Sequence, residues 1–385
     1  MKRVLYITTV SRTINAFLIP HIEKLIDEGY KVDCACAIDL KVDDRILAKG
    51  CNIFDIPFSR NPLHPKNIKA FRELRKIQEE NNYDIVHVHT PVASFVGRLA
   101  FRKEEKLKIL YTCHGFHFYK GSPIINWILF YPLEKLAAKW TDTLITINNE
   151  DYEVASKFKL RNSGQAIKMN GVGIEKEKYV IESFDRNKYR QFLNLNEDDF
   201  VILVLAELNK NKNHIQLIKA MNLLKDKYPN IKALFAGSGP LEKEIKNQIK
   251  DNGLEDKISL IGWRNDVKEL INSCDIVGLF SKREGLGKCI LEAMICGKPV
   301  IATNTRGPRE LIEENVNGFM FEVDDVQSTA KSIEKLYTKN NISQELEEKI
   351  TKKANKYLLE NVLNELNNIY EMTDIEESKL LGESV

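Results

Sequence analysis

The chain has 385 residues, of which 43% are hydrophobic and 29% are charged, which excludes a disordered or fibrous protein and leaves room for two or three domains. The formal net charge is only +2, with a basic excess before residue 175 and an acidic excess after it, and no nucleic-acid motif is present. No apolar run reaches the roughly 18 residues that span a bilayer, so we expect a cytoplasmic protein.

Short β-branched runs alternate with amphipathic stretches in chain order, and the alternation occurs twice. In the first half the expected strands are 3–9, 31–36, 84–89, 108–113 and 143–148, and the expected helices are 14–28, 66–81, 91–102, 124–140 and 149–159. In the second half the expected strands are 200–206, 231–236, 258–262, 275–280 and 299–303, and the expected helices are 214–227, 240–252, 266–273 and 286–296.

Apolar runs separated by helices indicate parallel sheets with helices on both faces. The pattern therefore predicts an α/β protein with two doubly wound halves that join near 165–200. We expect a first domain at 1–170, a second at 171–350, and a C-terminal helix at 351–385 that packs back towards the first domain and ends in a frayed tail. Ligands of such sheets bind at the carboxyl ends of the strands.

Seven cysteines are scattered along the chain, and none forms a C-x-x-C pair. Most lie in apolar strands or helices, where cysteine behaves as a small hydrophobe. We therefore expect neither a disulfide framework nor a zinc site. His114 and His117 are a poor metal pair, because no acidic ligand is near them in the sequence, and the chain has no D-x-D motif.

Two glycine-containing stretches follow strands of the second half, GSGP at 237–240 and EGLG at 284–287. Glycines at a helix start allow close backbone approach, and the exposed N–H groups there favour phosphate. Neither stretch is a Walker A or G-x-G-x-x-G sequence, so ATPase and dinucleotide-binding functions are not favoured. Lys212 follows another strand of this half, where it either neutralises a diphosphate or faces solvent.

Two glutamates stand out in REGLGKCILEAMICGKPVIA (283–302). Glu284 precedes the Gly-x-Gly turn, and Glu292 lies at the border of the apolar face of the following helix. Carboxylates are good acceptors for paired sugar hydroxyls. The alternative is structural: Glu292 is an exposed helix residue and Glu284 caps its neighbours.

The pair Glu284-x7-Glu292, followed by AMICGKPVIATNTRGPRELI (293–312), resembles the E-x7-E region of retaining glycosyltransferases of the GT-B fold, family-4 type. Other pieces that resemble the second domain of that family are NGVG (170–173), VLAELNKNKNH (204–214), FAGSGPL (235–241), GWRNDV (262–267) and NGFMFEVDD (317–325). In the first half, DIVHVHTPVAS (84–94) and TCHGFHFYKG (112–121) resemble the branch that builds bacterial capsule and exopolysaccharide.

The resemblance implies two Rossmann-like domains facing a central cleft and a metal-independent, retaining hexosyltransferase that uses a UDP-sugar and no cofactor. His114 would lie near the transferred sugar, Glu284 at its hydroxyls and Lys212 at the leaving diphosphate, and these are the implied catalytic residues. Glu292 would bind the ribose of the donor. The other implied donor-binding residues are Gly285, Leu286, Gly287, Trp263, Arg264, Gly237 and Gly239.

On the acceptor side the candidates are Arg12 and His117, and the polysaccharide branch implies a lipid-linked saccharide at the inner face of the cell membrane. The segment 119–140 is rich in aromatic and aliphatic residues with interspersed lysines. It is either in peripheral contact with that membrane or buried against the first sheet. The basic excess of the first half either faces an anionic surface or is ordinary scatter.

Two features depart from the family pattern. Many members carry an arginine five residues before the lysine, where this chain has Glu207. Either Glu207 points elsewhere, or another group such as Arg12 or Arg283 supplies the second positive charge. The first loop, TTVSRTINAF (8–17), lacks the paired glycines of many relatives.

Other functions fit the same fold. An epimerase should carry several catalytic carboxylates facing the sugar, and a phosphorylase needs a cofactor lysine. A non-catalytic protein would bind a UDP-sugar without releasing UDP. A transferase with a soluble acceptor is a further alternative, and the donor sugar, hexose or N-acetylhexosamine, stays open.

Overall fold

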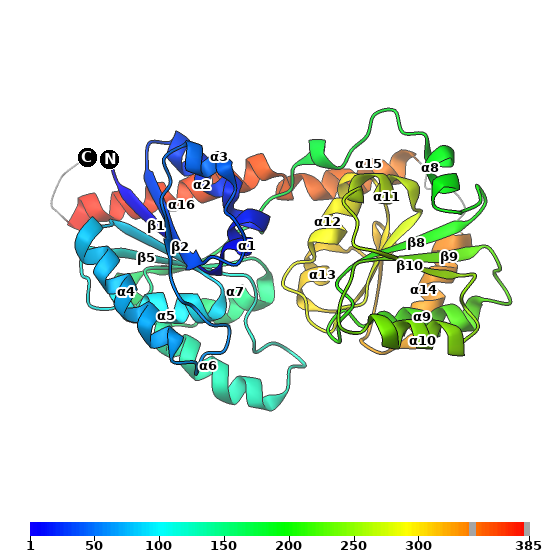
Figure 1. Ribbon diagram of the computed structural model, residues 1–385, viewed down its shortest axis with the longest axis horizontal. Helices are drawn as coiled ribbons and strands as arrows, with labels where there is room; N and C mark the ends of the chain where they lie inside the picture. The colour runs from blue at the N-terminus through cyan, green and yellow to red at the C-terminus, as the bar shows by residue number, and fades with distance from the viewer. Residues whose placement is uncertain (339–343, 381–385) are drawn as a thin grey trace. The chain divides into compact units, whose positions relative to one another are not determined.

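A computed structural model describes residues 1–338 and 344–380, and the chain forms two compact units. Unit 1 is Met1–Gly173 together with the chain from Leu359 onward, and unit 2 is Ile174–Leu358. Each unit is a central sheet with helices on both of its faces (Figure 1). Both boundaries lie a few residues beyond the expected ones.

The sheet of unit 1 has seven parallel strands in the order β3-β2-β1-β4-β5-β6-β7. The chain winds outward from β1 in one direction and from β4 in the other, so the topological switch point lies between these strands. The pattern does not predict β3 and β7, because these edge strands, IFD and QAIK, contain polar residues and no long apolar run. The strands are β1 (Arg3–Val10), β2 (Lys31–Ala37), β3 (Ile53–Asp55), β4 (Ile85–His89), β5 (Lys108–Cys113), β6 (Thr143–Thr146) and β7 (Gln165–Lys168).

Helices cover both faces of this sheet, with α4, α5 and α6 on one face and α2, α3 and α16 on the other (Figure 1). The helices are α2 (Ile19–Asp27), α3 (Asp44–Ala48), α4 (Lys66–Asn81), α5 (Pro91–Phe101), α6 (Ile124–Ala138), α7 (Asn149–Ala155) and α16 (Leu359–Leu380).

The expected helix at 14–28 is confirmed, but its first part is not a regular α-helix. The chain forms a short turn, α1 (Ser11–Thr13), and a wide π-type turn at Ile14–Leu18 before α2 begins. Pro20 lies at the start of α2 and has no N–H to donate to the carbonyl four residues earlier, which breaks the regular helix.

Unit 1 has a hydrophobic core on each face of its sheet. One contains Leu74 of α4 and Val88 of β4, and the other contains Tyr6 of β1 and Leu366 of α16. Burying a leucine or isoleucine side chain contributes about 1.5–3 kcal/mol, and Glu365 also accepts the backbone N–H of Asn170 at 2.9 Å. These contacts hold the C-terminal helix on unit 1.

The sheet of unit 2 has six parallel strands in the order β10-β9-β8-β11-β12-β13. Its switch point lies between β8 and β11. The four-residue strand β13 is not predicted by the sequence pattern. The strands are β8 (Phe200–Leu205), β9 (Ile231–Ala236), β10 (Ile258–Gly262), β11 (Ile276–Leu279), β12 (Val300–Thr303) and β13 (Gly318–Phe321).

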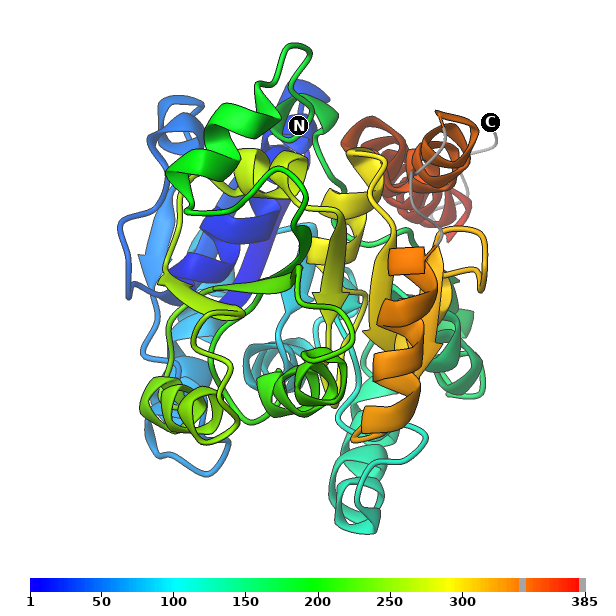
Figure 2. The same ribbon diagram turned by 90° about the vertical axis from the view of Figure 1, so that its right-hand side faces the viewer.

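In unit 2 the helices α9, α10 and α14 lie on one face of the sheet, and α11 and α12 lie on the other, with α15 packed against α12 (Figures 1 and 2). The pattern misses α8, α13 and α14. The helices are α8 (Arg186–Phe192), α9 (His214–Leu224), α10 (Glu242–Asp251), α11 (Val267–Ser273), α12 (Lys288–Ile295), α13 (Arg306–Leu311), α14 (Val326–Thr338) and α15 (Gln344–Ala354).

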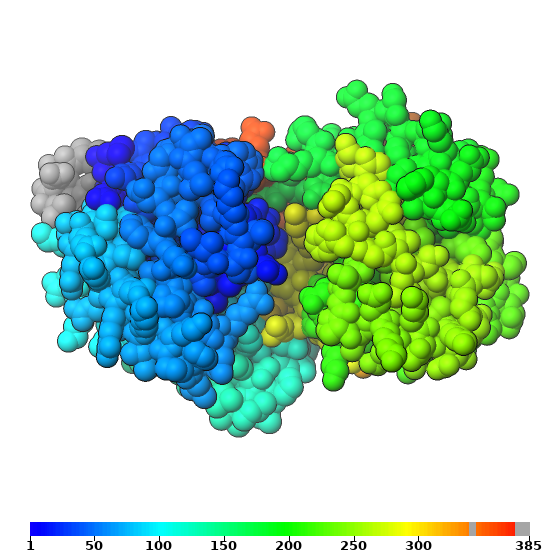
Figure 3. All heavy atoms as spheres, in the orientation of Figure 1, coloured from blue at the N-terminus to red at the C-terminus, as the bar shows by residue number. Residues whose placement is uncertain are grey.

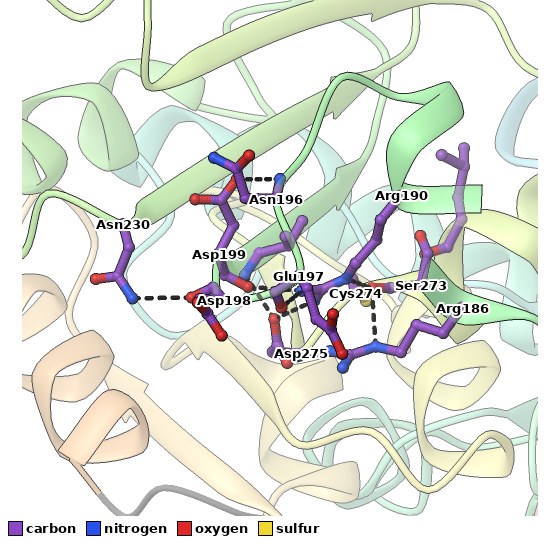
Figure 4. A network of polar contacts seen from close by, with 12 residues as sticks. Arg186, Arg190, Asn196, Glu197, Asp198, Asp199, Asn230, Ser273, Cys274 and Asp275 are labelled. Carbon is purple, nitrogen blue, oxygen red and sulfur yellow. Dashed lines mark hydrogen bonds and ion pairs between the residues drawn. The ribbon is translucent and has the colours of Figure 1, made fainter. Parts of the chain in front are cut away.

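A buried ionic network anchors α8 to the amino-terminal edge of this sheet (Figure 4). Asp275, just before β11, pairs with Arg190 at 2.7 Å and also with Arg186. Arg190 is 1% exposed and donates to the carbonyls of Ser273 and Asp199 at 2.9 and 2.8 Å. A buried guanidinium is tolerated only when its donors are paired, so this network is structural and lies opposite the edge where ligands of such sheets bind.

Candidate functional site

Loops at the carboxyl ends of the unit 2 strands carry most of the expected donor-binding residues and two of the implied catalytic residues, Lys212 and Glu284. Lys212 lies between β8 and α9, Gly237 and Gly239 follow β9, and Glu284 lies between β11 and α12. Parallel strands all end at the same edge, so residues far apart in the sequence lie in one region.

Lys212 and Glu284 form an ion pair, with Lys212 Nζ 2.8 Å from Glu284 Oε2. Both side chains are largely buried, at 24% and 19% exposed. Burial acts to lower the pKa of Lys212, but the Glu284 carboxylate outweighs it, so the pKa is raised and the lysine stays charged at neutral pH. The fold thus brings together a fixed cation and an acceptor, which suit a phosphate and a hydroxyl of one ligand.

Asn211 joins the two loops that carry this pair. Its side-chain amide donates to the carbonyl of Arg283 at 3.1 Å, and its side-chain oxygen accepts the Arg283 N–H at 3.1 Å. The backbone N–H of Lys282 donates to the Asn211 carbonyl at 2.8 Å. Sequence reasoning missed Asn211, because a single asparagine in a polar loop gives no signal of a partner 72 residues away.

The glycines of this edge allow close backbone packing. A Cβ on Gly237 would lie 2.0 Å from the carbonyl oxygen of Ala206, and one on Gly239 would lie 2.5 Å from that of Leu208. These two glycines let the loop after β9 lie directly on the loop that leads to Lys212. In the structure, the atoms closest to a Cβ at either glycine belong to the protein's own backbone.

The Gly285-Leu286-Gly287 turn leads into α12. Gly287 has φ +95°, which favours glycine, and it precedes the first residue of the helix. Leu286 is buried, and a Cβ on Gly307 would lie 2.6 Å from its backbone. The start of α13 therefore packs closely on the turn, which holds the backbone of 285–287 in place.

Glu292 is buried in α12, at 8% exposed. The hydroxyl of Tyr179 donates to its Oε1 at 2.7 Å, and Lys288 Nζ lies 3.5 Å from the same oxygen. Burial and the Glu292 carboxylate raise the pKa of Tyr179, so the tyrosine stays a donor at neutral pH. The alternative of an exposed Glu292 is wrong. Sequence reasoning missed Tyr179, which lies 113 residues earlier.

Trp263 and Arg264 lie in the loop after β10. The Trp263 side chain is 78% exposed. Arg264 Nε donates to Asp266 Oδ1 at 2.8 Å, and this hydrogen bond is the first cause of the raised pKa of Arg264. The loop thus presents a flat apolar ring beside a guanidinium that already has an acidic partner.

Glu207 is exposed, and its Oε2 accepts a hydrogen bond from Asn209 at 3.0 Å, so it stays within its own loop. A second buried cation, which sequence reasoning missed, contacts the Glu284 loop. Arg306 of α13 is 4% exposed, and its Nε donates to the Glu284 carbonyl at 3.4 Å. The sequence feature that could have pointed to Arg306 is the TRGPRE run, which follows strand β12. Arg283, a candidate for the second charge, is exposed.

In unit 1 the carboxyl ends of β4 and β5 carry a group of histidines. His89 ends β4 and His114 follows β5, and His89 Nδ1 lies 3.2 Å from His114 Nε2. His87 Nδ1 lies 2.9 Å from the Tyr370 hydroxyl. Burial and, to a smaller extent, nearby His21 together lower the pKa of His114 to about 4, so the imidazole is neutral at pH 7. His89 and His87 were not singled out from the sequence, although their alternation in HVH marks one side of a strand.

A strained turn fixes this edge at the switch point. Thr90, between β4 and α5, has φ +63°, an uncommon value for a β-branched residue. Its hydroxyl oxygen accepts the N–H of Thr9 at 3.0 Å and lies 2.7 Å from the Thr9 hydroxyl. These bonds join the end of β1 to the end of β4 beside His89.

Of the expected acceptor-side residues, neither lies with His114 in a hydrogen-bonded group. The ring of His117 packs on Phe130 of α6, with centroids 4.8 Å apart. Arg12 of α1 pairs with Asp39 at 2.8 Å. The structure therefore gives each of them a partner within its own neighbourhood of unit 1.

Helix α6 is only partly buried. Trp127, Phe130 and Tyr131 pack against the core of unit 1, and Figure 3 shows the segment, in teal, protruding from the surface of that unit. No helix of 1–338 and 344–380 is both long and apolar enough to cross a membrane. The large apolar side chains that α6 exposes are Ile124, Ile125, Ile128, Leu129, Leu133 and Leu136.

Within the part of the chain that the structure describes, no group of three or more His, Cys, Asp or Glu side chains is arranged to hold a metal ion. The seven cysteines are free. Cys34 and Cys51 lie closest, with sulfurs 3.7 Å apart in the core, and burial together with the Cys51 thiol raises the pKa of Cys34 well above its ordinary value.

Comparison with known families assigns each unit. The family model described as "Glycosyl transferase 4-like" matches residues 3–148, in unit 1. The model described as "Glycosyl transferases group 1" matches residues 185–357, in unit 2. The two matched ranges together cover most of the chain.

Individual relatives extend over the full length. EpsD of Bacillus subtilis (strain 168), named as a glycosyltransferase, is 37% identical over 375 residues, 96% of each chain. The UDP-Gal:alpha-D-GlcNAc-diphosphoundecaprenol alpha-1,3-galactosyltransferase of Escherichia coli is 30% identical over 312 residues, 80% of each chain. The crystal structure of Anabaena Alr3699/HepE in complex with UDP-glucose shares the fold, with a TM-score of 0.79, 21% identity, and coverage of 97% of this chain and 100% of that one. The chain therefore belongs to the glycosyltransferases and has the two-domain GT-B architecture.

Proposed function

We propose that this protein is a retaining hexosyltransferase that moves a sugar from a UDP-sugar to a saccharide carried on a polyprenyl diphosphate, in the synthesis of a bacterial surface polysaccharide. The observation that carries the proposal is the Lys212–Glu284 ion pair beside the 285–287 turn, followed by a buried Glu292. The E. coli relative is named for a UDP-Gal donor and a diphosphoundecaprenol-linked acceptor, and a Staphylococcus aureus relative, CapM, 25% identical over 333 residues, is named for capsular polysaccharide biosynthesis.

The donor binds to unit 2 in this proposal. Glu292, oriented by Tyr179, accepts hydrogen bonds from the ribose hydroxyls. Glu284 accepts from hydroxyls of the transferred sugar, and Lys212 lies against the diphosphate. Trp263 and Arg264 border the base, and the backbone of 285–287 and the glycines after β9 contact sugar and diphosphate.

Transfer follows from positioning and electrostatics. The bond between the anomeric carbon and the diphosphate oxygen breaks, the acceptor oxygen attacks the same face of the sugar, and its proton passes to the leaving phosphate. Lys212 stabilises the charge that develops on UDP. Arg306, buried beside the Glu284 loop, is the second cation in place of the arginine that Glu207 replaces. The start of α12 adds favourable N–H groups, and we propose that the reaction needs no metal.

The acceptor is lipid-linked in this proposal, and α6 places unit 1 on the inner face of the cell membrane. Six large apolar side chains of α6 are between 44% and 73% exposed, which is unusual for one helix of a globular protein. Exposed Lys135 and Lys139 flank them and favour anionic lipid headgroups.

UDP release tests the proposal. The protein is incubated without added metal with UDP-GlcNAc, UDP-GalNAc, UDP-glucose, UDP-galactose and GDP-sugars, each with and without membranes that contain polyprenyl-diphosphate saccharides. We expect UDP release from one donor, only with membranes. UDP release that does not need membranes would indicate a soluble acceptor instead of a lipid-linked one. UDP binding without any release from the whole panel would contradict the transferase and favour a non-catalytic protein.

A further inference from the structure

His114, which the family resemblance places near the transferred sugar, is held by a second histidine. His89 Nδ1 lies 3.2 Å from His114 Nε2, and the two rings stack with centroids 5.5 Å apart and planes at 26°. His89 is 1% exposed. Its ring also lies 5.3 Å from that of Tyr6 and 4.3 Å from that of His87, so it is fixed on both sides.

Both partners are neutral imidazoles. Burial lowers the pKa of His114 to about 4, and burial together with the neighbouring His87, His114 and His21 lowers the pKa of His89 well below its ordinary value. A neutral imidazole has one N–H donor and one acceptor nitrogen. In the bond between them, one ring must therefore donate and the other accept, which fixes the tautomers of both together.

The other nitrogen of His89 decides the direction. His89 Nε2 is buried and has no hydrogen-bond partner among the described residues. If His114 donated, His89 would carry its proton on Nε2 as a buried N–H without an acceptor, which is the rarer and costlier arrangement. If His89 donates from Nδ1, only an acceptor lone pair is left unused. His87 does not compete, because its nitrogens already face Tyr370 and Thr112 at 2.9 and 2.7 Å.

We infer that His89 is a positioning residue that donates to His114 Nε2 and thereby holds the His114 proton on Nδ1, the ring nitrogen that His89 does not engage. His114 is then a hydrogen-bond donor to the substrate and not a general base. The acceptor's proton has to leave by another route, which in the proposed reaction is the departing UDP phosphate. This inference rests on the proposed function only in placing His114 at the substrate.

Nitrogen-15 NMR of histidine-labelled, ligand-free protein tests the tautomer directly. At neutral pH the two ring nitrogens of His114, assigned with a His114→Gln variant, report which of them carries the proton. We expect Nδ1 to show the protonated, pyrrole-type shift and Nε2 the unprotonated, pyridine-type shift. A His114 ring protonated on Nε2 would overturn the inference. The result does not depend on whether the protein transfers a sugar.

Two variants of His89 test the cause. His89→Phe keeps the stacked ring but removes the donor, so we expect His114 to lose its single tautomer and turnover to fall about tenfold or more, with little change in the KM of the donor. His89→Asn can place an amide N–H near the position of Nδ1 and should restore the Nδ1–H tautomer and much of the turnover.

A His114 tautomer that is unchanged in His89→Phe would show that His89 does not set it. The unfolding temperature of each variant shows whether a loss of turnover is simply a loss of folding. The tautomer measured in the wild type tests the inference even if a variant does not fold. If the tautomer is as expected but no variant affects turnover, the proposed place of His114 in the reaction fails while the tautomer assignment stands.

Discussion

The carboxyl edges of the two sheets have the same architecture but hold opposite kinds of polar groups. In unit 2 the edge is ionic: Lys212 pairs with Glu284, and the buried Arg306 and Glu292 lie in the adjoining helices. In unit 1 the buried group at the switch point is neutral, with His89 and His114 hydrogen-bonded to each other, and the ion pair of this edge, Arg12 with Asp39, is more exposed. Pairing keeps groups charged when they are partly buried, whereas burial without an opposite charge makes imidazole neutral.

The difference indicates that the two edges suit chemically different ligand groups. Fixed charges suit an anionic ligand such as a nucleotide diphosphate, because they need no reorganisation when the ligand arrives. Neutral donors suit uncharged hydroxyls, because they orient a sugar without repelling or trapping an anion.

The largest effect is expected when the ionic edge is broken at Glu284. Glu284→Gln removes the partner of Lys212 and the proposed acceptor for the sugar hydroxyls, and turnover should fall about 100-fold or more. UDP release under saturating donor measures it. Lys282→Ala is the control, since Lys282 lies in the same loop but pairs with Asp324 at 3.1 Å, and it should change turnover by less than about twofold. Full activity of Glu284→Gln would refute the assigned role.

The next effect concerns α6 of unit 1. Replacing both Ile128 and Leu129 by glutamate places charge on its exposed apolar face and should lower binding to anionic vesicles about tenfold or more. Co-sedimentation with the vesicles measures this, and UDP binding should not change. The control is Leu223→Glu, because Leu223 of α9 in unit 2 is 48% exposed, close to the 52% of Leu129. Equal loss in both variants would show that α6 is not a specific membrane surface.

A smaller effect is expected at Tyr179. Tyr179→Phe removes one hydrogen bond that orients Glu292, and UDP should bind about three- to tenfold more weakly, a loss of about 0.7–1.4 kcal/mol. Isothermal titration measures the affinity. Tyr337→Phe is a matched control, because its hydroxyl bonds to Asn230 at 2.8 Å on another part of unit 2. An unchanged affinity in Tyr179→Phe would mean that Glu292 does not need this partner.

The last prediction concerns the pH dependence of stability, to which buried histidines of both units contribute. Burial lowers the pKa of His114 to about 4, with His21 adding to it, and burial followed by Lys212 lowers that of His214 to about 4. The unfolded chain binds these protons near pH 6.5, so stability is complete above about 6.5 and is lost as the pH falls towards about 4. Thermal unfolding between these values should show the loss, and His114→Gln or His214→Gln should each reduce its slope. An unchanged slope in both would contradict the burial of these rings as neutral groups.

The regular elements of both sheets could be predicted because apolar runs repeat between amphipathic helices. The edge strands β3, β7 and β13 could not, since none of them lies in a long apolar run, whereas the equally short β6, β11 and β12 do. The helix at 14–28 was predicted, but the π-type turn at Ile14–Leu18 was not, although Pro20 is a local signal of irregularity there. The helix α8 is held by Arg190 and Asp275, 85 residues apart, which no local pattern reveals.

The candidate site was predicted in part. Lys212, Glu284 and Glu292 were named from their positions after strands and from a family resemblance, but two structural alternatives stayed open for the glutamates. The partners that decide between them, above all Tyr179 and Arg306, come from other segments of unit 2. His89 was hidden in a strand, where an alternating histidine is indistinguishable from a residue that only packs in the core.

The central claim is that the ionic edge of unit 2 binds a nucleotide diphosphate without a metal. The most direct test is isothermal titration of UDP into the full-length protein in the presence of EDTA, compared with Glu292→Ala. We predict clear binding to the wild type and a loss of at least about tenfold in the variant, since the ribose loses its charged acceptor. No binding to the wild type under these conditions, or equal binding to both proteins, would contradict the account.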